Sequence, residues 1–172
     1  SEIHKIQRML EPADRVKKGR RRYKMFNCHR VTGQSKCSAL MLVCNENLYL
    51  IDDYQLDAST GEIVDVNEEG ASGRPLSPTE VTSEELAARK RSGTTRGTAG
   101  LTRRTLALGH VCRKWSYDEL ETVARRRYLL QRTALEIFSD DGRNEFLSFE
   151  SPEVADVVKR ALSKASSGGS LL

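Results

Sequence analysis

The sequence predicts a mainly β domain of antiparallel strands that is closed by one C-terminal helix. Three observations support this fold class. Short segments with alternating apolar positions lie between Phe26 and Ile51, a second pair of such segments flanks the turn sequence Asp140 to Arg143, and an amphipathic helical pattern follows from Ser151. No run of about 18 apolar residues occurs, so no membrane-spanning helix is expected.

Residues 1–24 are interpreted as a basic N-terminal lead-in. A short amphipathic pattern begins at Ile3 and ends at Pro12, and the run from Lys17 to Lys24 is the most basic in the chain. We expect this segment to be a solvated approach to the first strand. Contact with acidic lipid headgroups is the alternative interpretation.

The next segments predict a meander of three strands. They span Phe26 to Thr32, Cys37 to Cys44 and Leu48 to Ile51, and the polar residues between them favour hairpin connections. Consecutive strands joined in this way pair antiparallel. Such a meander must bury one face.

Residues 57–108 differ in composition from the rest of the chain. They contain no aromatic residue, and the only strand candidate is the weak one from Glu62 to Val66. Low hydrophobicity and dense charge cannot offset the entropy of ordering a chain, so we expect a disordered insertion here. The folded domain is then residues 25–165 with this interruption, followed by a Gly/Ser tail at 166–172.

The fold resumes at Val111. A strand to Tyr117 would place Trp115 and Tyr117 on the same side, and Leu120 with Val123 predicts a short turn of helix. The three arginines from Arg125 to Arg127 then alternate between strand faces. Ion pairs with Glu119, Glu121 or Glu136 are the structural interpretation of these arginines.

A hairpin and a helix complete the domain. Leu135 and Leu147 belong to the two alternating segments, and Asp141-Gly142 between them predicts a tight hairpin because glycine supplies the positive φ of a primed turn. Ser151 is the predicted N-cap and Pro152 the first helical residue. The apolar stripe of this helix is Val154, Val157, Val158, Ala161, Leu162 and Ala165.

Catalytic and metal-binding chemistry is not indicated. The four cysteines have no C-x-x-C spacing and the three histidines have no ligand spacing. Cys28 and His29 are neighbours that a strand would send to opposite faces, and no glycine-rich phosphate loop precedes a helix. We therefore expect no enzyme activity, no metal and no cofactor. The cysteines are expected to be reduced, because no secretory signal is present.

Several short motifs, in their order along the chain, resemble the PH-like domain that precedes BEACH domains. In the first half they are Arg8-Met9-Leu10-Glu11-Pro12, Cys28-His29-Arg30-Val31 and Asn47-Leu48-Tyr49-Leu50-Ile51-Asp52. In the second half they are Lys114-Trp115, Arg126-Arg127-Tyr128-Leu129-Leu130, Thr133-Ala134-Leu135-Glu136-Ile137-Phe138 and Asp141-Gly142-Arg143. The resemblance covers residues 8–56 and 111–162.

This resemblance implies a PH-like fold, with two nearly orthogonal antiparallel sheets capped by one C-terminal α-helix. It also implies a non-catalytic scaffold module that docks on the BEACH domain of the same polypeptide and serves vesicle trafficking, membrane dynamics or autophagy. We accordingly expect a monomeric, cytoplasmic domain at the periphery of intracellular membranes.

Two sets of candidate site residues follow from the sequence. The candidates for protein interaction are Trp115, Arg125, Arg126, Arg127 and Tyr128, because large aromatic residues and arginine are enriched in binding hot spots. The alternative function is binding to phosphoinositides or acidic membranes, with the candidates Lys17, Lys18, Arg20, Arg21, Arg22 and Lys24. The loop from Thr32 to Lys36 holds only one cation, which argues against specific headgroup recognition. Specific nucleic-acid binding is not expected, because the basic runs lack interleaved aromatic residues apart from Tyr23.

Overall fold

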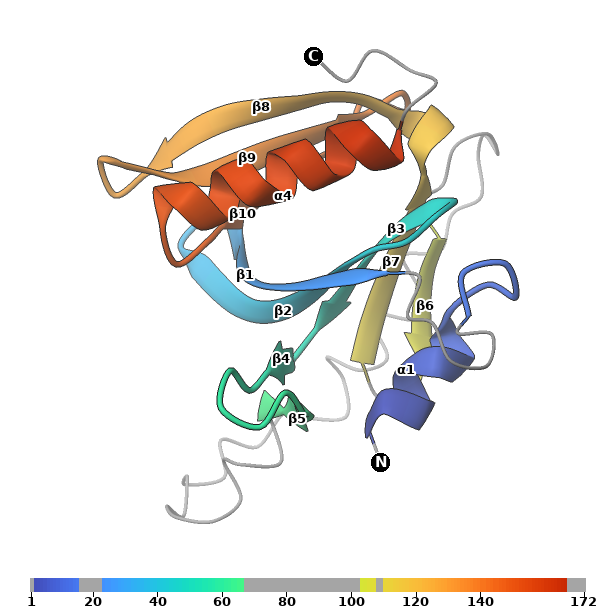
Figure 1. Cartoon of the computed structure of the whole chain (residues 1–172). Helices are drawn as coiled ribbons and strands as arrows, with labels where there is room; N and C mark the ends of the chain where they lie inside the picture. Colours follow the sequence, from blue (N-terminus) through green and yellow to red (C-terminus); the bar gives the residue numbers. More distant parts are fainter. Residues whose placement is uncertain (1, 16–22, 67–102, 108–109, 167–172) are drawn as a thin grey trace, which may run out of the picture.

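The computed structural model describes residues 2–15, 23–66, 103–107 and 110–166, and their arrangement is shown in Figure 1. Ten strands and a C-terminal helix dominate the described chain, which confirms the predicted mainly β fold class. In chain order the elements are α1 (Glu2–Met9), β1 (Lys24–Thr32), β2 (Ser35–Val43), β3 (Asn47–Asp52), β4 (Tyr54–Leu56), β5 (Ile63–Asp65), β6 (Arg103–Ala107), β7 (His110–Ser116), η2 (Tyr117–Glu119), β8 (Leu120–Tyr128), β9 (Gln131–Ser139), β10 (Asn144–Ser148) and α4 (Pro152–Ala165).

Eight of the strands form one antiparallel sheet in the order β6-β7-β3-β2-β1-β10-β9-β8, and β4 pairs with β5 in a separate small hairpin. The sheet bends strongly, so that in Figure 1 β8 and β9 lie above helix α4 while β1 and β2 lie below it. The two expected sheets are therefore two arms of one continuous hydrogen-bonded sheet. They meet where β1 pairs with β10, with His29 opposite Ser148.

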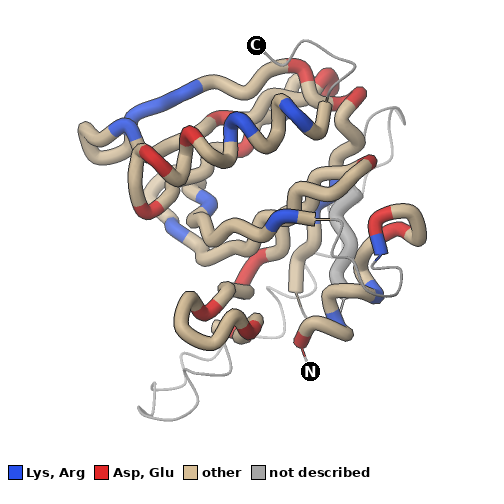
Figure 2. Tube along the Cα trace, in the orientation of Figure 1, with Lys and Arg blue, Asp and Glu red and all other residues tan. Residues whose placement is uncertain are grey.

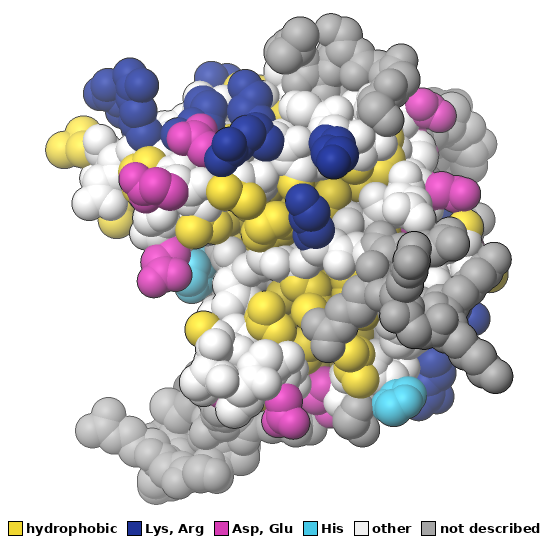
Figure 3. All heavy atoms as spheres, viewed as in Figure 1, with side chains coloured by type: hydrophobic (Ala, Val, Ile, Leu, Met, Phe, Trp, Pro, Cys, Tyr) yellow, Lys and Arg dark blue, Asp and Glu magenta, His cyan; other side chains and the backbone are white. Residues whose placement is uncertain are grey.

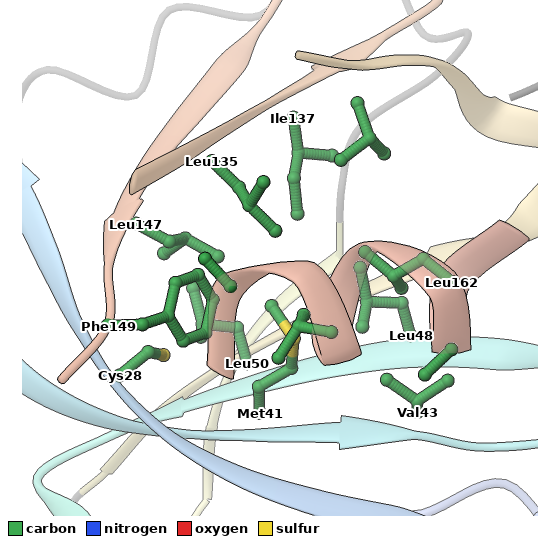
Figure 4. Close-up of a cluster of buried hydrophobic side chains, with 14 of the residues drawn as sticks. Cys28, Met41, Val43, Leu48, Leu50, Leu135, Ile137, Leu147, Phe149 and Leu162 are labelled. Carbon is green, nitrogen blue, oxygen red and sulfur yellow. The ribbon is translucent and has the colours of Figure 1, made fainter. Parts of the chain in front are cut away.

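Helix α4 closes the main core. Its Ala155, Val158 and Leu162 are buried against side chains from both arms of the sheet, among them Leu135 and Met41 (Figure 4). The predicted apolar stripe is correct except at Val157, which is 42% exposed, and Ala155 takes a buried position instead. The helix begins as predicted, because the backbone N–H of Val154 donates to the Ser151 hydroxyl at 3.3 Å and proline follows that cap.

The predicted meander is confirmed, but it buries both of its faces. Strand β2 sends Met41 into the main core, while Leu40 and Leu42 enter a second apolar cluster on the opposite face. Helix α1 and the β4–β5 hairpin cover this second cluster, to which Ile6 contributes a fully buried side chain. Helix α1 and the β4–β5 hairpin thus cover a face of the meander that the alternation pattern predicts to be exposed to solvent.

The N-terminal segment is consequently more than a solvated approach in its described part. Leu10 is buried in the second cluster, and the buried Asp14 carboxylate accepts hydrogen bonds from Asn47 Nδ2 at 2.6 Å and from the Tyr49 hydroxyl at 3.0 Å. These contacts fasten residues 2–15 to strand β3. The amphipathic pattern from Ile3 to Leu10 signalled this packing face.

The connection from β7 to β8 differs from the sequence expectation. Tyr117 begins a short 3-10 helix instead of continuing the strand beyond Trp115, and Leu120 opens strand β8 instead of a helical turn. The Tyr117 hydroxyl donates to the carbonyl of Cys44 at 2.6 Å, which draws this residue out of the strand direction. Val123 is buried in the main core from a strand position.

Two strands lie within residues 57–108, the range for which a disordered insertion was predicted. Strand β5 lies within this range at the weak strand candidate, where Ile63 is buried in the second cluster, and strand β6 pairs with β7. The remainder of the insertion, at 67–102 and 108, lies outside the described residues, as do Lys17 to Arg22 and residues 167–172 of the predicted tail. Within the described ranges, no helix is both long and apolar enough to cross a bilayer.

Candidate interaction surface

Trp115 does not belong to an exposed surface. It lies on β7 with 3% of its surface exposed and packs in the main core, opposite Leu48 in the sheet register. Its burial argues against the predicted contact of this side chain with a partner. An aromatic side chain of this size is worth more as buried core than as a surface contact, and the two arms of the sheet offered that burial.

Arg125 and Arg126 are engaged within the domain, on opposite faces of β8. The Arg125 guanidinium contacts Asp156 of α4 at 3.1 Å and donates to the Pro152 carbonyl at 3.3 Å. Arg126 pairs with Glu136 of β9 at 2.6 Å, which is one of the ion pairs expected from the sequence, and lies 5.9 Å from the Phe138 ring. Both arginines have a structural role.

Arg127 and Arg132 are different, because both are exposed and neither has an ion-pair partner among the described residues. They lie on β8 and β9, on either side of the β8–β9 turn. Figure 2 shows basic residues along this end of β8. Their positive charge is therefore available to a partner.

A second set of charged side chains is neutralised within the domain. The almost fully buried Arg113 contacts Asp52 at 2.7 Å and Glu145 at 3.3 Å, and Arg30 contacts the second oxygen of Asp52 at 3.0 Å. A buried guanidinium requires such partners, since an uncompensated buried charge is strongly destabilising. This cluster joins β1, β3, β7 and β10 and serves the fold.

Leu129 and Leu130 form the apex of the β8–β9 hairpin. Tyr128 pairs with Gln131, so the loop has only these two residues, and their φ values are +47° and +69°. Positive φ at both central positions is the property of a type I′ turn, which normally uses asparagine and glycine. Leu129 is 77% exposed and Leu130 is 91% exposed. We call these two residues the leucine apex.

A shallow groove runs beside the leucine apex across the outer face of β1, β9 and β10. Its volume is about 420 Å³, and both polar and aromatic side chains line it. The lining residues are Asn27, His29, Lys36, Gln55, Tyr128, Leu129, Gln131, Thr133, Ser148, Phe149 and Glu150. Leu130 is not among them.

Tyr128 stands between this groove and the apex. Its ring is 5.7 Å from Lys36 Nζ and 6.3 Å from the Phe146 ring, which holds the half-buried side chain in place. Burial, followed by the charge of Lys36, lowers the pKa of His29 in the groove, so this imidazole is neutral at physiological pH. The groove therefore offers a polar, aromatic surface with one cation at Lys36.

The predicted membrane candidates are only partly described. Lys24 is exposed at the start of β1, whereas Lys17, Lys18 and Arg20 to Arg22 lie outside the described residues. Figure 3 shows the side of the molecule that is viewed in Figure 1, with dark blue side chains gathered above the helix and yellow ones at the protruding end of the β8–β9 hairpin.

The described residues form no cluster suited to a metal ion. They contain no group of three or more His, Cys, Asp or Glu side chains that could hold a metal ion. All four cysteines are free, and burial raises the pKa of Cys112 to about 11 and that of Cys28 still further. Such thiols remain protonated near neutral pH and are poor nucleophiles.

Sequence reasoning did not identify the leucine apex as a feature of the surface. In the sequence the pair stands out only as the end of the motif from Arg126 to Leu130, because two leucines between alternating segments look like the continuation of a strand. The available signal was the spacing, since two strands separated by two residues require a primed turn whatever those residues are.

Comparison with known proteins places this architecture in context. The family model described as "PH domain associated with Beige/BEACH" matches residues 76–163, a range that contains β6 to β10 and most of α4. The similarity noted at residues 8–56 lies outside that match. Among solved structures, the C-terminal domain of an unknown protein from Leishmania infantum aligns with 81% of this chain and 81% of its own, at 10% identity and a TM-score of 0.39.

Proposed function

Because the chain belongs to the family of PH domains associated with Beige/BEACH, we propose that it is a docking module that binds the BEACH domain of its own polypeptide. The family match over residues 76–163 is the observation on which this proposal depends. Modules of this family are non-catalytic. The proposed role is that of a scaffold in a large protein that serves vesicle trafficking, membrane dynamics or autophagy.

The groove beside Tyr128 is the surface that we assign to this docking. It is hollowed, it combines aromatic and hydrogen-bonding side chains, and it lies on the strands that the family match includes together with β1. Tyrosine at the edge of such a hollow is a frequent hot spot, because it buries a large ring and keeps a polar end. Arg127, next to Tyr128 in sequence, is the predicted interaction arginine that has no ion-pair partner among the described residues.

Trp115, Arg125 and Arg126 are excluded from the proposed contact. The first is core, and the guanidinium groups of the other two already bind Asp156 and Glu136. A partner that recruited these arginines would have to break ion pairs within the domain.

The test is isothermal titration of the chain with the BEACH domain of the proposed parent polypeptide, supplied as a separate protein. We expect binding, and we expect Tyr128→Ala and Lys36→Glu each to weaken it about tenfold or more, as loss of a hot-spot contact does. Arg8→Ala is the matched control, since Arg8 is exposed on α1, away from the β8–β9 hairpin in Figure 1.

Two results would contradict the proposal. Absence of binding by the unchanged chain removes the docking function itself. Equal binding by the Tyr128→Ala, Lys36→Glu and Arg8→Ala variants would keep the function but remove the groove as its site.

A further inference from the structure

The leucine apex is the most exposed apolar feature of the described chain. Leu129 and Leu130 are the only large hydrophobic residues there that are more than half exposed, and Val157 on α4, at 42%, comes next. The apex lies at the protruding end of the β8–β9 hairpin in Figure 1. The inference concerns what contacts this apex.

The local structure opposes leucine at both positions. A side chain with a Cβ atom is disfavoured at positive φ, so two successive leucines store strain that asparagine and glycine would avoid. Exposure of both side chains to water adds a second unfavourable contribution. A sequence that violates local preferences in two ways at one site commonly does so for binding.

The two charged residues that flank the apex on the hairpin are both basic. Arg127 precedes it by two residues and Arg132 follows it by two, and both are exposed and without ion-pair partners in the described part of the chain. Lys36 adds a third cation across Tyr128. Glu136, the acidic residue nearest in sequence on β9, is already bound to Arg126 and Asn144.

The form of the apex indicates the class of partner. A stable protein interface needs an apolar centre surrounded by a polar rim, on about 800 Å² of each partner. Here the exposed apolar surface consists of two consecutive residues on a convex tip, and cations surround them. That combination fits insertion into the headgroup layer of a membrane, where the leucines reach the acyl boundary and the arginines meet lipid phosphates and carboxylates.

We propose that the β8–β9 hairpin is a membrane-insertion element, in which Leu129 and Leu130 enter an acidic lipid surface and Arg127 and Arg132 bind its headgroups. This site is separate from Lys17 to Lys24, the membrane candidates predicted from sequence. Of the two leucines, Leu129 also lines the groove and Leu130 does not, so the two proposed sites adjoin at Leu129.

Co-sedimentation with lipid vesicles tests the proposal. The unchanged chain should bind vesicles of phosphatidylcholine and phosphatidylserine at about 150 mM salt. The double variant Leu129→Asn with Leu130→Gly gives the turn its preferred residues and removes the apolar side chains. Binding should fall about tenfold to a hundredfold, while the urea midpoint of the variant should equal or exceed that of the unchanged chain.

A second pair of variants isolates the cations. Arg127→Gln with Arg132→Gln should weaken binding to the acidic vesicles roughly fivefold for each arginine, without effect on pure phosphatidylcholine vesicles. Arg160→Gln with Lys164→Gln is the control, because it makes the same charge change at exposed positions of α4. The affinity of this control for acidic vesicles should stay close to that of the unchanged chain.

Three outcomes overturn the inference. They are absence of vesicle binding by the unchanged chain, undiminished binding by the Leu129→Asn, Leu130→Gly variant, and equal losses in the two charge variants. If the apex variant loses titration with the BEACH domain but keeps vesicle binding, the leucines belong to the protein interface and the membrane assignment falls. Failure of the groove variants in that titration leaves the membrane inference intact.

Discussion

His110 Nε2 lies 2.8 Å from Asp65 Oδ2, with each side chain 7% exposed. Tyr54 covers the imidazole, with ring centroids 4.2 Å apart. Asp65 ends β5 and His110 begins β7. Most of the predicted insertion lies between these two residues in sequence. This buried pair holds the end of β5 against the start of β7.

Loss of this pair should destabilise the domain. Asp65→Asn leaves His110 buried beside a neutral amide, and we expect the free energy of unfolding to fall by about 1–3 kcal/mol, the usual range when a buried partner is removed. Urea denaturation followed by circular dichroism measures the change. Glu62→Gln is the control, because Glu62 is exposed two residues before Val64 in the same hairpin and should change stability by less than about 0.5 kcal/mol. Equal effects in the two variants would mean that the pair contributes nothing.

Introducing glycine at one hairpin turn and removing it from the other should have opposite effects on the stability of the domain. Leu130→Gly relieves a leucine at φ +69° and should raise the free energy of unfolding by about 0.5–1 kcal/mol. Gly142→Ala introduces a Cβ at φ +79° and should lower it by about 1 kcal/mol, although no atom lies within 4 Å of that Cβ. Thermal and urea denaturation of both variants provides the measurement. A lower free energy of unfolding for Leu130→Gly would contradict this prediction, because it would mean that the Leu130 side chain stabilises the fold.

Trp115 should behave as a core residue. Trp115→Ala is expected to lower the free energy of unfolding by about 3–5 kcal/mol, because it leaves a large cavity between the arms of the sheet. Trp115→Phe should cost less, and Arg127→Ala should be nearly neutral. The single tryptophan also provides a direct probe, since its fluorescence should be blue-shifted in the native state and move to longer wavelength in urea. An emission maximum typical of exposed indole in the native chain would contradict this placement.

The buried thiols should make the domain sensitive to alkali. Burial raises the pKa of Cys112 from its ordinary value of 9.0 to about 11. Between these values the unfolded chain loses this proton while the folded chain keeps it, so stability falls as pH rises from 9 to 11. The contribution of Cys112 is about 3 kcal/mol. Cys112→Ala should flatten the fall in urea midpoint over that range, and Cys37→Ala, at a half-buried position, should flatten it less. Identical slopes in all three proteins would refute the assignment.

Alternation and capping signals predicted most of the secondary structure. Strands β1, β2, β3, β9 and β10 and helix α4 lie where apolar periodicity, Ser151 and Pro152 placed them. These signals are local, and the local preference agrees with the tertiary structure in these elements. The departures occur where a distant contact decides, as when the Tyr117 hydroxyl finds the Cys44 carbonyl or when α1 covers the outer face of β2.

The two hairpin turns show why the candidate surface was harder to predict. Asp141-Gly142 suggested a primed turn, but Ser139 and Arg143 are bonded through the Ser139 N–H at 2.9 Å, which leaves a three-residue loop with positive φ at Gly142 alone. The turn with two positive φ values is the one that contains Leu129 and Leu130. Sequence composition identifies a turn when its residues are typical of turns, as Asp141 and Gly142 are. It does not identify a turn that is built from leucines.

The pairing of β1 with β10 has a consequence for synthesis of the chain. During translation β1 and β2 can form a hairpin early, but the other edge of β1 stays open until the residues around Leu147 leave the ribosome. Contacts between such distant segments slow folding, and an unpaired edge rich in apolar side chains is prone to aggregation while it waits. Production of this domain should therefore depend on chaperones and temperature more strongly than its final stability would suggest.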